Sequence, residues 1–288
     1  MKKIIFVFIC IFSSVNIFAF DIAQKEECIL HYESSPFKLN LALDLSLLGT
    51  GSALTGGTFL AKKFITNQTY DGTFFDINSV NAFDRWAMKP YSESIHKAGT
   101  AVCLFTAASP FVIIAGQTVC GNFPLEELLT FGTMYVESFL FSHGIKESLK
   151  ICVRRVRPYM YFDSEKPEDK LSDGDWQYSF PSGHTTFAFM GASFATSTFA
   201  YYFPKSSWRI PVACLSFGLA GTTAALRMMS GNHYFSDVLA GAAIGSLCGW
   251  FVPFLHNKIG QSKKVKEFTE NGNQLSFLPN GVYVKFAL

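Results

Sequence analysis

Charged residues are scarce in this chain. They make up 16% of its 288 residues, whereas soluble domains average about 25%. The formal net charge is only +2 and no long basic stripe is present, so the sequence predicts no nucleic-acid partner. The chain also lacks a Pro/Gly/Ser-rich linker and an internal repeat, which favours one domain with short tails over two domains.

Cysteine clusters are absent as well. The seven cysteines form no C-x-x-C pair and no Cys/His group with zinc spacing, and we predict neither a metal nor a cofactor. Cys103, Cys214 and Cys248 lie in apolar runs and are expected to behave as small hydrophobic residues. A disulfide between Cys28 and Cys120 is left open, as is the oligomeric state.

Hydrophobic residues, in contrast, are abundant. They form 49% of the chain, with 31 Phe and a mean hydropathy of +0.22. Six apolar segments approach the ~20 residues that a bilayer crossing needs, and we predict an all-α membrane bundle of about five to six transmembrane helices. The first segment is weak because it contains Asp44, and the third contains Glu137 and His143, which we expect to be packing partners. The segments are 41–61, 98–118, 126–145, 184–203, 210–227 and 238–255.

The two ends of the chain have their own character. Residues 1–20, "MKKIIFVFICIFSSVNIFAF", are typical of a signal peptide cleaved near Ala19, with an uncleaved signal anchor as the alternative. Residues 256–288 form a basic tail, and its last part, "NQLSFLPNGVYVKFAL", predicts a short β-hairpin. Between them we place an N-terminal tail with the first apolar helices at 21–125 and the core at 126–255.

Two polar stretches carry the unusual residues. One, "KESLKICVRRVRPYMYFDSEKPEDKLSDGDWQYSF", follows the third apolar segment, and the other, "MMSGNHYFSD", follows the fifth. Two crossings separate them, so they lie on the same side of the membrane. Flanking basic residues are nearly balanced and do not choose that side. A leader followed by six crossings places the site inward, whereas five crossings place it in the periplasm; we predict the periplasmic face of a bacterial inner membrane.

The first cluster in these stretches is basic. Lys150 and Arg157 are seven residues apart, which predicts one helical face and a separation of about 10 Å, and Pro158 is expected to end the helix. Arg154 could line the same face, whereas Arg155 is expected to point elsewhere.

The second cluster, Pro181-Ser182-Gly183-His184, opens an apolar helix. A helix N-terminus offers free N–H groups to an anion, Gly183 lets an oxygen approach the backbone, and the Ser182 hydroxyl adds a donor.

The third cluster is Arg227, His233 and Asp237. His233 and Asp237 are four residues apart, so on a helix the carboxylate would hold one ring nitrogen and leave the other free to attack.

Together the patterns K-x6-R-P, P-S-G-H and R-x5-H-x3-D resemble the signature of the type 2 phosphatidic-acid phosphatase superfamily, which includes lipid phosphate phosphatases, acid phosphatases and vanadium haloperoxidases. Leu226 departs from the serine that the family usually has before the arginine of its last cluster. The resemblance covers about residues 126–255 and implies a metal-independent phosphatase with a phosphohistidine intermediate. Its expected catalytic residues are the nucleophile His233, the acid and base His184, and Asp237; phosphate would bind Lys150, Arg157, Ser182, Gly183 and Arg227.

The apolar helices favour a lipid substrate, for which the resemblance offers undecaprenyl diphosphate, phosphatidylglycerol phosphate or a lipid A phosphate. A periplasmic non-specific acid phosphatase and a vanadate-dependent haloperoxidase are the alternatives, and a scaffold or transporter would leave both histidines unexplained. We expect the acidic loop 159–180 to be solvated. The alternative is that it forms a lid that admits or rejects substrates. Asp84-Arg85-Trp86 could dock against the site.

Overall fold

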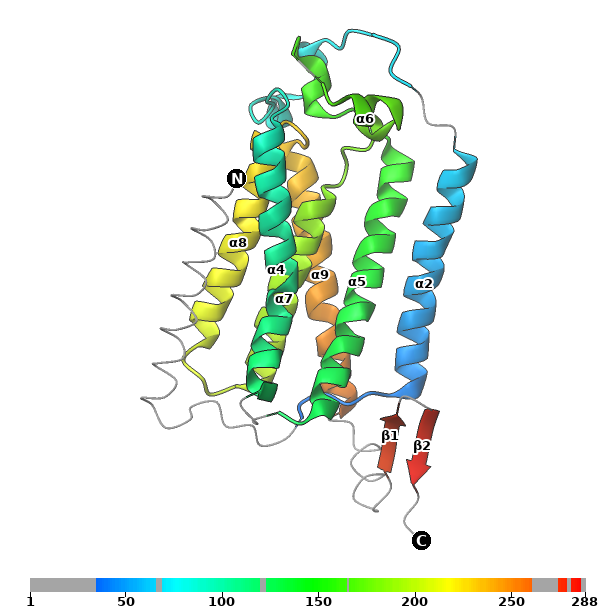
Figure 1. Cartoon of the computed structure of the whole chain (residues 1–288), viewed down its shortest axis with the longest axis vertical. Helices are drawn as coiled ribbons and strands as arrows, with labels where there is room; N and C mark the ends of the chain where they lie inside the picture. The colour runs from blue at the N-terminus through cyan, green and yellow to red at the C-terminus, as the bar shows by residue number, and fades with distance from the viewer. Residues whose placement is uncertain are drawn as a thin grey trace.

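In the described part of the chain, six long helices run side by side and form a bundle (Figure 1). The computed structural model describes residues 35–65, 69–119, 123–164, 166–260, 274–278 and 281–285. The predicted leader and the predicted Cys28–Cys120 pair lie outside these residues. The fold is all-α, as the hydropathy pattern predicts, and each apolar segment forms one helix. These helices are α2 (Leu41–Phe64), α4 (Glu93–Val119), α5 (Leu125–Val153), α7 (Gly183–Tyr202), α8 (Arg209–Met229) and α9 (Phe235–Gly260).

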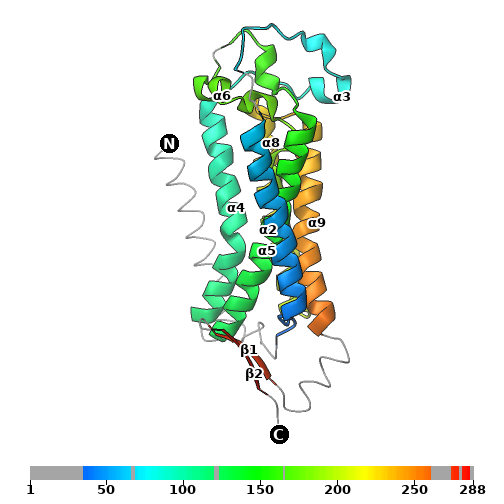
Figure 2. The same ribbon diagram turned by 90° about the vertical axis from the view of Figure 1, so that its right-hand side faces the viewer.

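Short elements cap one end of the bundle (Figure 2). They belong to the segments before α4 and before α7, which are the longest polar connections among the described residues. These elements are η1 (Ile77–Ser79), α3 (Ala82–Arg85), η2 (Pro158–Tyr161), α6 (Glu168–Ser172) and η3 (Asp175–Gln177). We call this the capped end and the opposite one the far end.

The predicted C-terminal hairpin is present beyond the far end (Figure 1). Strands β1 (Gln274–Leu278) and β2 (Gly281–Lys285) pair antiparallel, with Gln274 opposite Lys285 and Leu278 opposite Gly281.

Helix α7 lies at the centre of the bundle and packs against α9, α8, α4 and α5, while α2 packs on α5. The α7–α9 contact is close because α9 presents Gly241, Gly245 and Gly249 at every fourth position. A Cβ at Gly245 would collide with the carbonyl oxygen of Thr186 on α7. Small residues at such spacing let two helix backbones approach closely, so the start of α7, which carries the P-S-G-H cluster, is held tightly against α9.

The far half of the bundle interior is aromatic. Phe131 and Phe194 meet edge to face with ring centroids 4.9 Å apart, and Phe37 packs against Tyr202 at 5.2 Å. Large apolar side chains also cover the outside of the helices, among them Leu45, Phe59, Leu104, Leu129, Leu215, Leu247 and Phe251. Among the described helices, Arg209–Met229 and the Phe235–Ile259 part of α9 are long and apolar enough to cross a membrane.

Candidate active site

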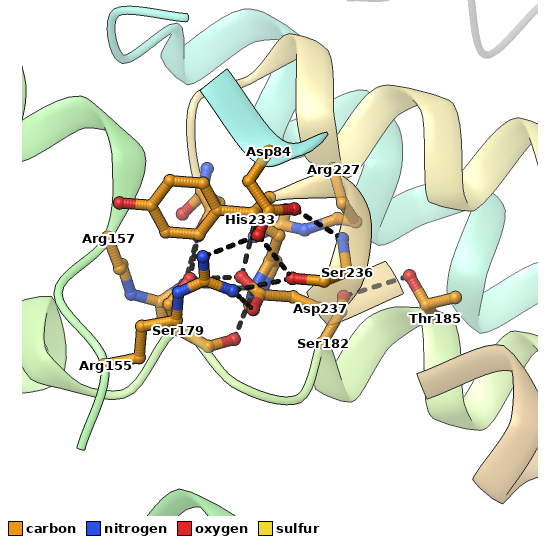
Figure 3. Close-up of polar contacts among 12 residues, drawn as sticks. Asp84, Arg155, Arg157, Ser179, Ser182, Thr185, Arg227, His233, Ser236 and Asp237 are labelled. Carbon is orange, nitrogen blue, oxygen red and sulfur yellow. Dashed lines mark hydrogen bonds and ion pairs between the residues drawn. The ribbon is translucent and has the colours of Figure 1, made fainter. Parts of the chain in front are cut away.

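The two polar stretches meet at the capped end, where side chains from four segments converge (Figure 3). The segment after α5 brings Arg155 and Arg157, and the segment before α7 brings Ser179. The third cluster faces them: Arg227 ends α8, and Asp237 lies in the first turn of α9. The prediction that both stretches lie at the same end of the bundle is therefore confirmed.

The spacing predicted that Lys150 and Arg157 share one helical face, and this prediction is wrong. Helix α5 ends at Val153, because Arg154 takes a left-handed conformation with φ of 46°. Arg157 is then extended, with φ −72° and ψ 149°, just before Pro158, as the clash of proline with a preceding helical residue requires. The reversal turns Arg157 into the site, where it is 4% exposed.

The buried guanidinium of Arg157 links the acidic loop to the third cluster. Its Nη2 donates to both carboxylate oxygens of Asp175 at 2.8 Å, and its Nη1 lies 3.3 Å from Nε2 of His233. Burial would raise the pKa of Asp175, but Arg157 outweighs it and holds that pKa below its ordinary value. The expectation of a solvated loop is wrong for this residue, which packs onto the site.

His233 is held by a backbone carbonyl rather than by a carboxylate. Its Nδ1 lies 2.7 Å from the carbonyl oxygen of Ser179. A carbonyl can only accept, so Nδ1 carries the proton and Nε2 carries the lone pair in the neutral ring. Burial lowers the pKa of His233 well below its ordinary value, and the charges of Arg157, Arg227 and Lys150 lower it further. At neutral pH the ring is therefore uncharged, with Nε2 facing the cations.

The predicted helical pairing of His233 with Asp237 is wrong in its detail. His233 lies in the loop before α9, and its Nδ1 is 3.7 Å from Oδ2 of Asp237, beyond hydrogen-bond range. The fully buried Asp237 accepts instead from Ser179 Oγ at 2.5 Å, the Tyr234 N–H at 2.9 Å and Arg155 Nη1 at 2.8 Å. Asp237 thus fixes the segment whose carbonyl orients His233, and acts on the ring through Ser179.

Arg155 was expected to point elsewhere, and that expectation is wrong. Its guanidinium bridges two carboxylates, with Nη2 2.7 Å from Asp84 and Nη1 2.8 Å from Asp237, and stacks 3.8 Å above the ring of Tyr234. Asp84 also accepts from the backbone N–H and hydroxyl of Ser236, both at 2.8 Å. The Asp84-Arg85-Trp86 segment therefore does dock against the site, through its aspartate.

Arg227 enters the site from the end of α8 and is 1% exposed. Its Nη1 lies 3.0 Å from Nδ1 of His96 on α4, while its buried Nε has no hydrogen-bond partner among the described residues. A buried guanidinium nitrogen without a partner is costly unless an anion completes it. His96 carried no signal in the sequence, because only packing of α4 against α8 brings it here.

The P-S-G-H cluster opens α7 as predicted, with Ser182 as the residue before the helix and Gly183 as its first residue. The first backbone bond of α7 joins the Thr186 N–H to the Ser182 carbonyl, so the N–H groups of the three residues between them have no partner within the helix. The buried Ser182 hydroxyl accepts from Thr185 at 2.9 Å and keeps its own proton to donate.

His184 contacts α4. Its Nε2 lies 3.1 Å from Oγ1 of Thr100, which donates its single proton to the carbonyl of His96. Nε2 of His184 is therefore the donor in this pair. Its ring centroid is 6.1 Å from that of His96, so the two histidines form one wall of the site.

Two lysines complete the positive charge. Lys150, in the last turn of α5, has no hydrogen bond or ion pair among the described residues, yet lies close enough to lower the pKa of His233. Lys170 of α6, which the sequence did not indicate, donates to Oδ1 of Asn232 at 3.0 Å. Burial and the nearby charge of Arg157 together lower the pKa of Lys170 to about 8. Besides Arg155, which compensates two carboxylates, the site therefore gathers Lys150, Arg157, Lys170 and Arg227 near a neutral histidine, an arrangement that suits a phosphate.

The part of the chain that carries this site matches a known protein family. Residues 131–261, which include every predicted site residue, match the model of the PAP2 superfamily. This segment, somewhat less than half of the chain, is thus similar to the PAP2 superfamily, which agrees with the resemblance found in its motifs.

Curated relatives are similar over the same part. A lipid A 1-phosphatase from Rhizobium etli is 36% identical over 121 residues, 42% of this chain and 47% of that protein. A lipid A 1-phosphatase from Rhizobium johnstonii is 36% identical over 113 residues, 39% of this chain and 41% of that protein. The chain thus spans less than half the length of these relatives. A solved structure, a transmembrane PAP2 type phosphatidylglycerolphosphate phosphatase from Bacillus subtilis, aligns with a TM-score of 0.43 and 21% identity, over 76% of this chain and 98% of that one.

Proposed function

We propose that this protein is a membrane phosphatase that hydrolyses a lipid-linked phosphate through a phosphohistidine at His233. The observation that carries the proposal is the state of that ring. Nδ1–H is fixed on the Ser179 carbonyl, so the lone pair of Nε2 points toward the guanidinium of Arg157. A phosphate bound by Arg157 would place its phosphorus in front of a neutral, oriented nucleophile.

The reaction proceeds in two displacements. Nε2 of His233 attacks phosphorus, the bond to the leaving oxygen breaks, and that oxygen takes a proton from the imidazolium form of His184, which becomes a neutral ring. His184, now a base, removes a proton from water; the resulting oxygen attacks phosphorus and releases inorganic phosphate and His233. Lys150, Arg157 and Arg227 compensate the charge on the phosphoryl oxygens in both steps, together with the N–H groups that open α7.

The substrate we propose is the 1-phosphate of lipid A, because the two rhizobial relatives carry that activity in their names. Undecaprenyl diphosphate and phosphatidylglycerol phosphate contain the same chemistry and are the competing substrates of the test. The apolar exterior of the helices favours these lipids over the soluble esters of a non-specific acid phosphatase.

We propose that the capped end faces the periplasm from the bacterial inner membrane. Helix α2 runs along the bundle (Figure 1), so this orientation places Lys38, just before α2, on the cytoplasmic side with Lys205, Arg209 and Lys258. It differs from the arrangement of a leader followed by six crossings, and the nearly balanced basic residues do not choose between the two. The exposed Cys152, near the capped end of α5, is a natural reporter. It should react with a membrane-impermeant maleimide in intact spheroplasts, as peptide mapping would show; reaction only after lysis would place the site in the cytoplasm.

The activity is tested by phosphate release from the three purified lipids in detergent, alongside a soluble ester. Wild-type protein should release phosphate fastest from lipid A, and its phosphoenzyme should be stable in alkali and labile in acid. We expect His233→Ala to lose at least about 10³-fold in kcat, as nucleophile removal does. His143→Ala, which removes an α5 histidine outside the site, is the control and should retain activity. Turnover by His233→Ala within tenfold of wild type would refute the nucleophile.

A further inference from the structure

Three titratable residues that the reaction does not use meet in the far half of the bundle. Asp44 lies in the first turn of α2, Glu137 in α5, and His256 near the end of α9. Their exposed fractions are 6%, 0% and 0%. His256 is 19 residues beyond Asp237 on the same helix, a distance of about 29 Å along its axis, so the cluster is separate from the phosphate site.

The ring of His256 is oriented toward the two carboxylates. Its Nδ1 lies 3.2 Å from the carbonyl oxygen of Lys38, which can only accept, so Nδ1 carries a proton. Its Nε2 faces Oε2 of Glu137 at 2.8 Å and Oδ1 of Asp44 at 3.7 Å. One ligand atom from each of the three residues lies within 4.8 Å of the others.

The cluster is short of positive charge. Among the described residues, His256 is the one cationic group within ion-pair distance of either carboxylate. A proton shared by His256 and Glu137 would leave one negative charge buried without compensation, which is costly. In addition, Oδ1 of Asp44 and Oε1 of Glu137 are buried and have no hydrogen-bond partner in the described part of the chain.

We propose that Asp44, Glu137 and His256 bind a divalent transition-metal ion of the zinc class. Two carboxylates and a neutral imidazole balance a charge of +2. Imidazole nitrogen with carboxylate oxygens is a ligand set that zinc accepts, at about 2.0–2.2 Å. Tetrahedral ligands at that distance from zinc lie about 3.4 Å apart, so Glu137 and His256, now at 2.8 Å, would move slightly apart and Asp44 would move slightly closer. The Nδ1–H contact to a backbone carbonyl is the outer contact that zinc-bound histidines usually make.

The position of the cluster gives the ion a structural role. Each ligand comes from a different helix, and α2 packs mainly on α5. A metal at this point would tie α2 and α9 to α5 in the far half of the bundle (Figure 2). The ion would therefore stabilise the fold, and its removal would act on stability before it acts on the chemistry about 29 Å away along α9.

The test uses the full-length, tag-free protein in detergent, freed of metal by a chelator and then dialysed against Zn²⁺. We expect about one zinc per chain and a higher Tm with zinc than with EDTA. Asp44→Asn and Glu137→Gln should each lower the affinity for zinc at least about tenfold and abolish the zinc-dependent rise in Tm. Glu127→Gln is the matched control, because it removes another buried α5 carboxylate, one that accepts a hydrogen bond from Tyr202; it should retain the zinc.

A second measurement keeps the proposal falsifiable if the variants do not fold. X-ray absorption at the zinc edge of the wild-type protein should show one imidazole and oxygen ligands. Wild-type protein without zinc at saturating concentration, equal zinc in all variants, or a sulfur-ligated zinc would each overturn the site. These outcomes leave the phosphatase proposal untouched, since it is judged by phosphate release.

Discussion

Replacing Arg155 by methionine should destabilise the protein, because this arginine compensates two buried carboxylates at once. Its guanidinium lies 2.7 Å from Asp84 and 2.8 Å from Asp237, whose side chains are 3% and 0% exposed. Methionine keeps much of the aliphatic volume but supplies no donor. Both carboxylates would then remain buried beside each other without their common cation.

The expected loss can be scaled from buried ion pairs in general. Removing one partner of such a pair costs about 3–5 kcal/mol, and the 23% exposure of the Arg155 side chain favours the lower figure. A loss of about 3 kcal/mol corresponds to a fall in Tm of roughly 6–12 °C for a chain of this size. The assay is thermal unfolding of the detergent-solubilised protein, followed by its helical circular dichroism.

The sign of the pH dependence provides an independent check. Burial would raise the pKa of Asp84, but the hydrogen bonds from Arg155 and Ser236 outweigh it, and the pKa lies below its ordinary value. This stabilisation is present above the pKa of the unfolded chain, near 3.8, and is lost as the pH falls through the folded value. Without Arg155, burial raises the pKa of Asp84. The variant should therefore lose least stability relative to wild type at acid pH, where Asp84 is protonated. The Tm difference from wild type should therefore shrink between pH 7 and pH 4.5.

A double-mutant cycle separates this mechanism from a general loss of packing. Asp84→Asn removes one of the two charges, so the double variant should recover about 1–2 kcal/mol relative to the sum of the single changes. Arg154→Met is the control, since the neighbouring arginine makes a long hydrogen bond to Gln177 at 3.4 Å and lies 6.0 Å from the ring centroid of Tyr178; its replacement should cost less than about 0.5 kcal/mol. Additive single changes, or a Tm difference that is the same at both pH values, would refute the reasoning.

Two further predictions follow from the capped end and the helix interface. Lys170, with a pKa of about 8, is charged below that pH; phosphate affinity should weaken as the pH rises through 8, seen as a rising KM, and Lys170→Met should remove this limb from the profile. In contrast, Gly245→Ala should lower the Tm, because its Cβ meets the Thr186 carbonyl, at a cost of about 1–3 kcal/mol or more. Gly218→Ala on α8, where nothing lies within 4 Å, should leave the Tm unchanged or raise it; similar effects at the two glycines would contradict the close α7–α9 contact.

Much of the fold could be predicted because it depends on local composition. Runs of about twenty apolar residues predict helices, and each such run became one. The P-S-G-H cluster was placed correctly at a helix start, since cap residues act on the turn that follows them. The helical readings of Lys150 with Arg157 and of His233 with Asp237 failed. Helix α5 ends before Arg157, where Arg154 has a positive φ, and α9 begins only at Phe235, after His233.

The sequence by itself determined the six helices, the chemical types gathered in the three clusters, and the end of the bundle at which they meet. Only the tertiary structure decided which group holds which. Asp84 reaches Ser236 across 152 positions of the chain, the Ser179 carbonyl replaces a carboxylate on His233, and three helices bring Asp44, Glu137 and His256 together. The physical reason is that propensity and hydropathy act over a few residues, whereas these contacts depend on how whole helices pack, which no short stretch of sequence encodes.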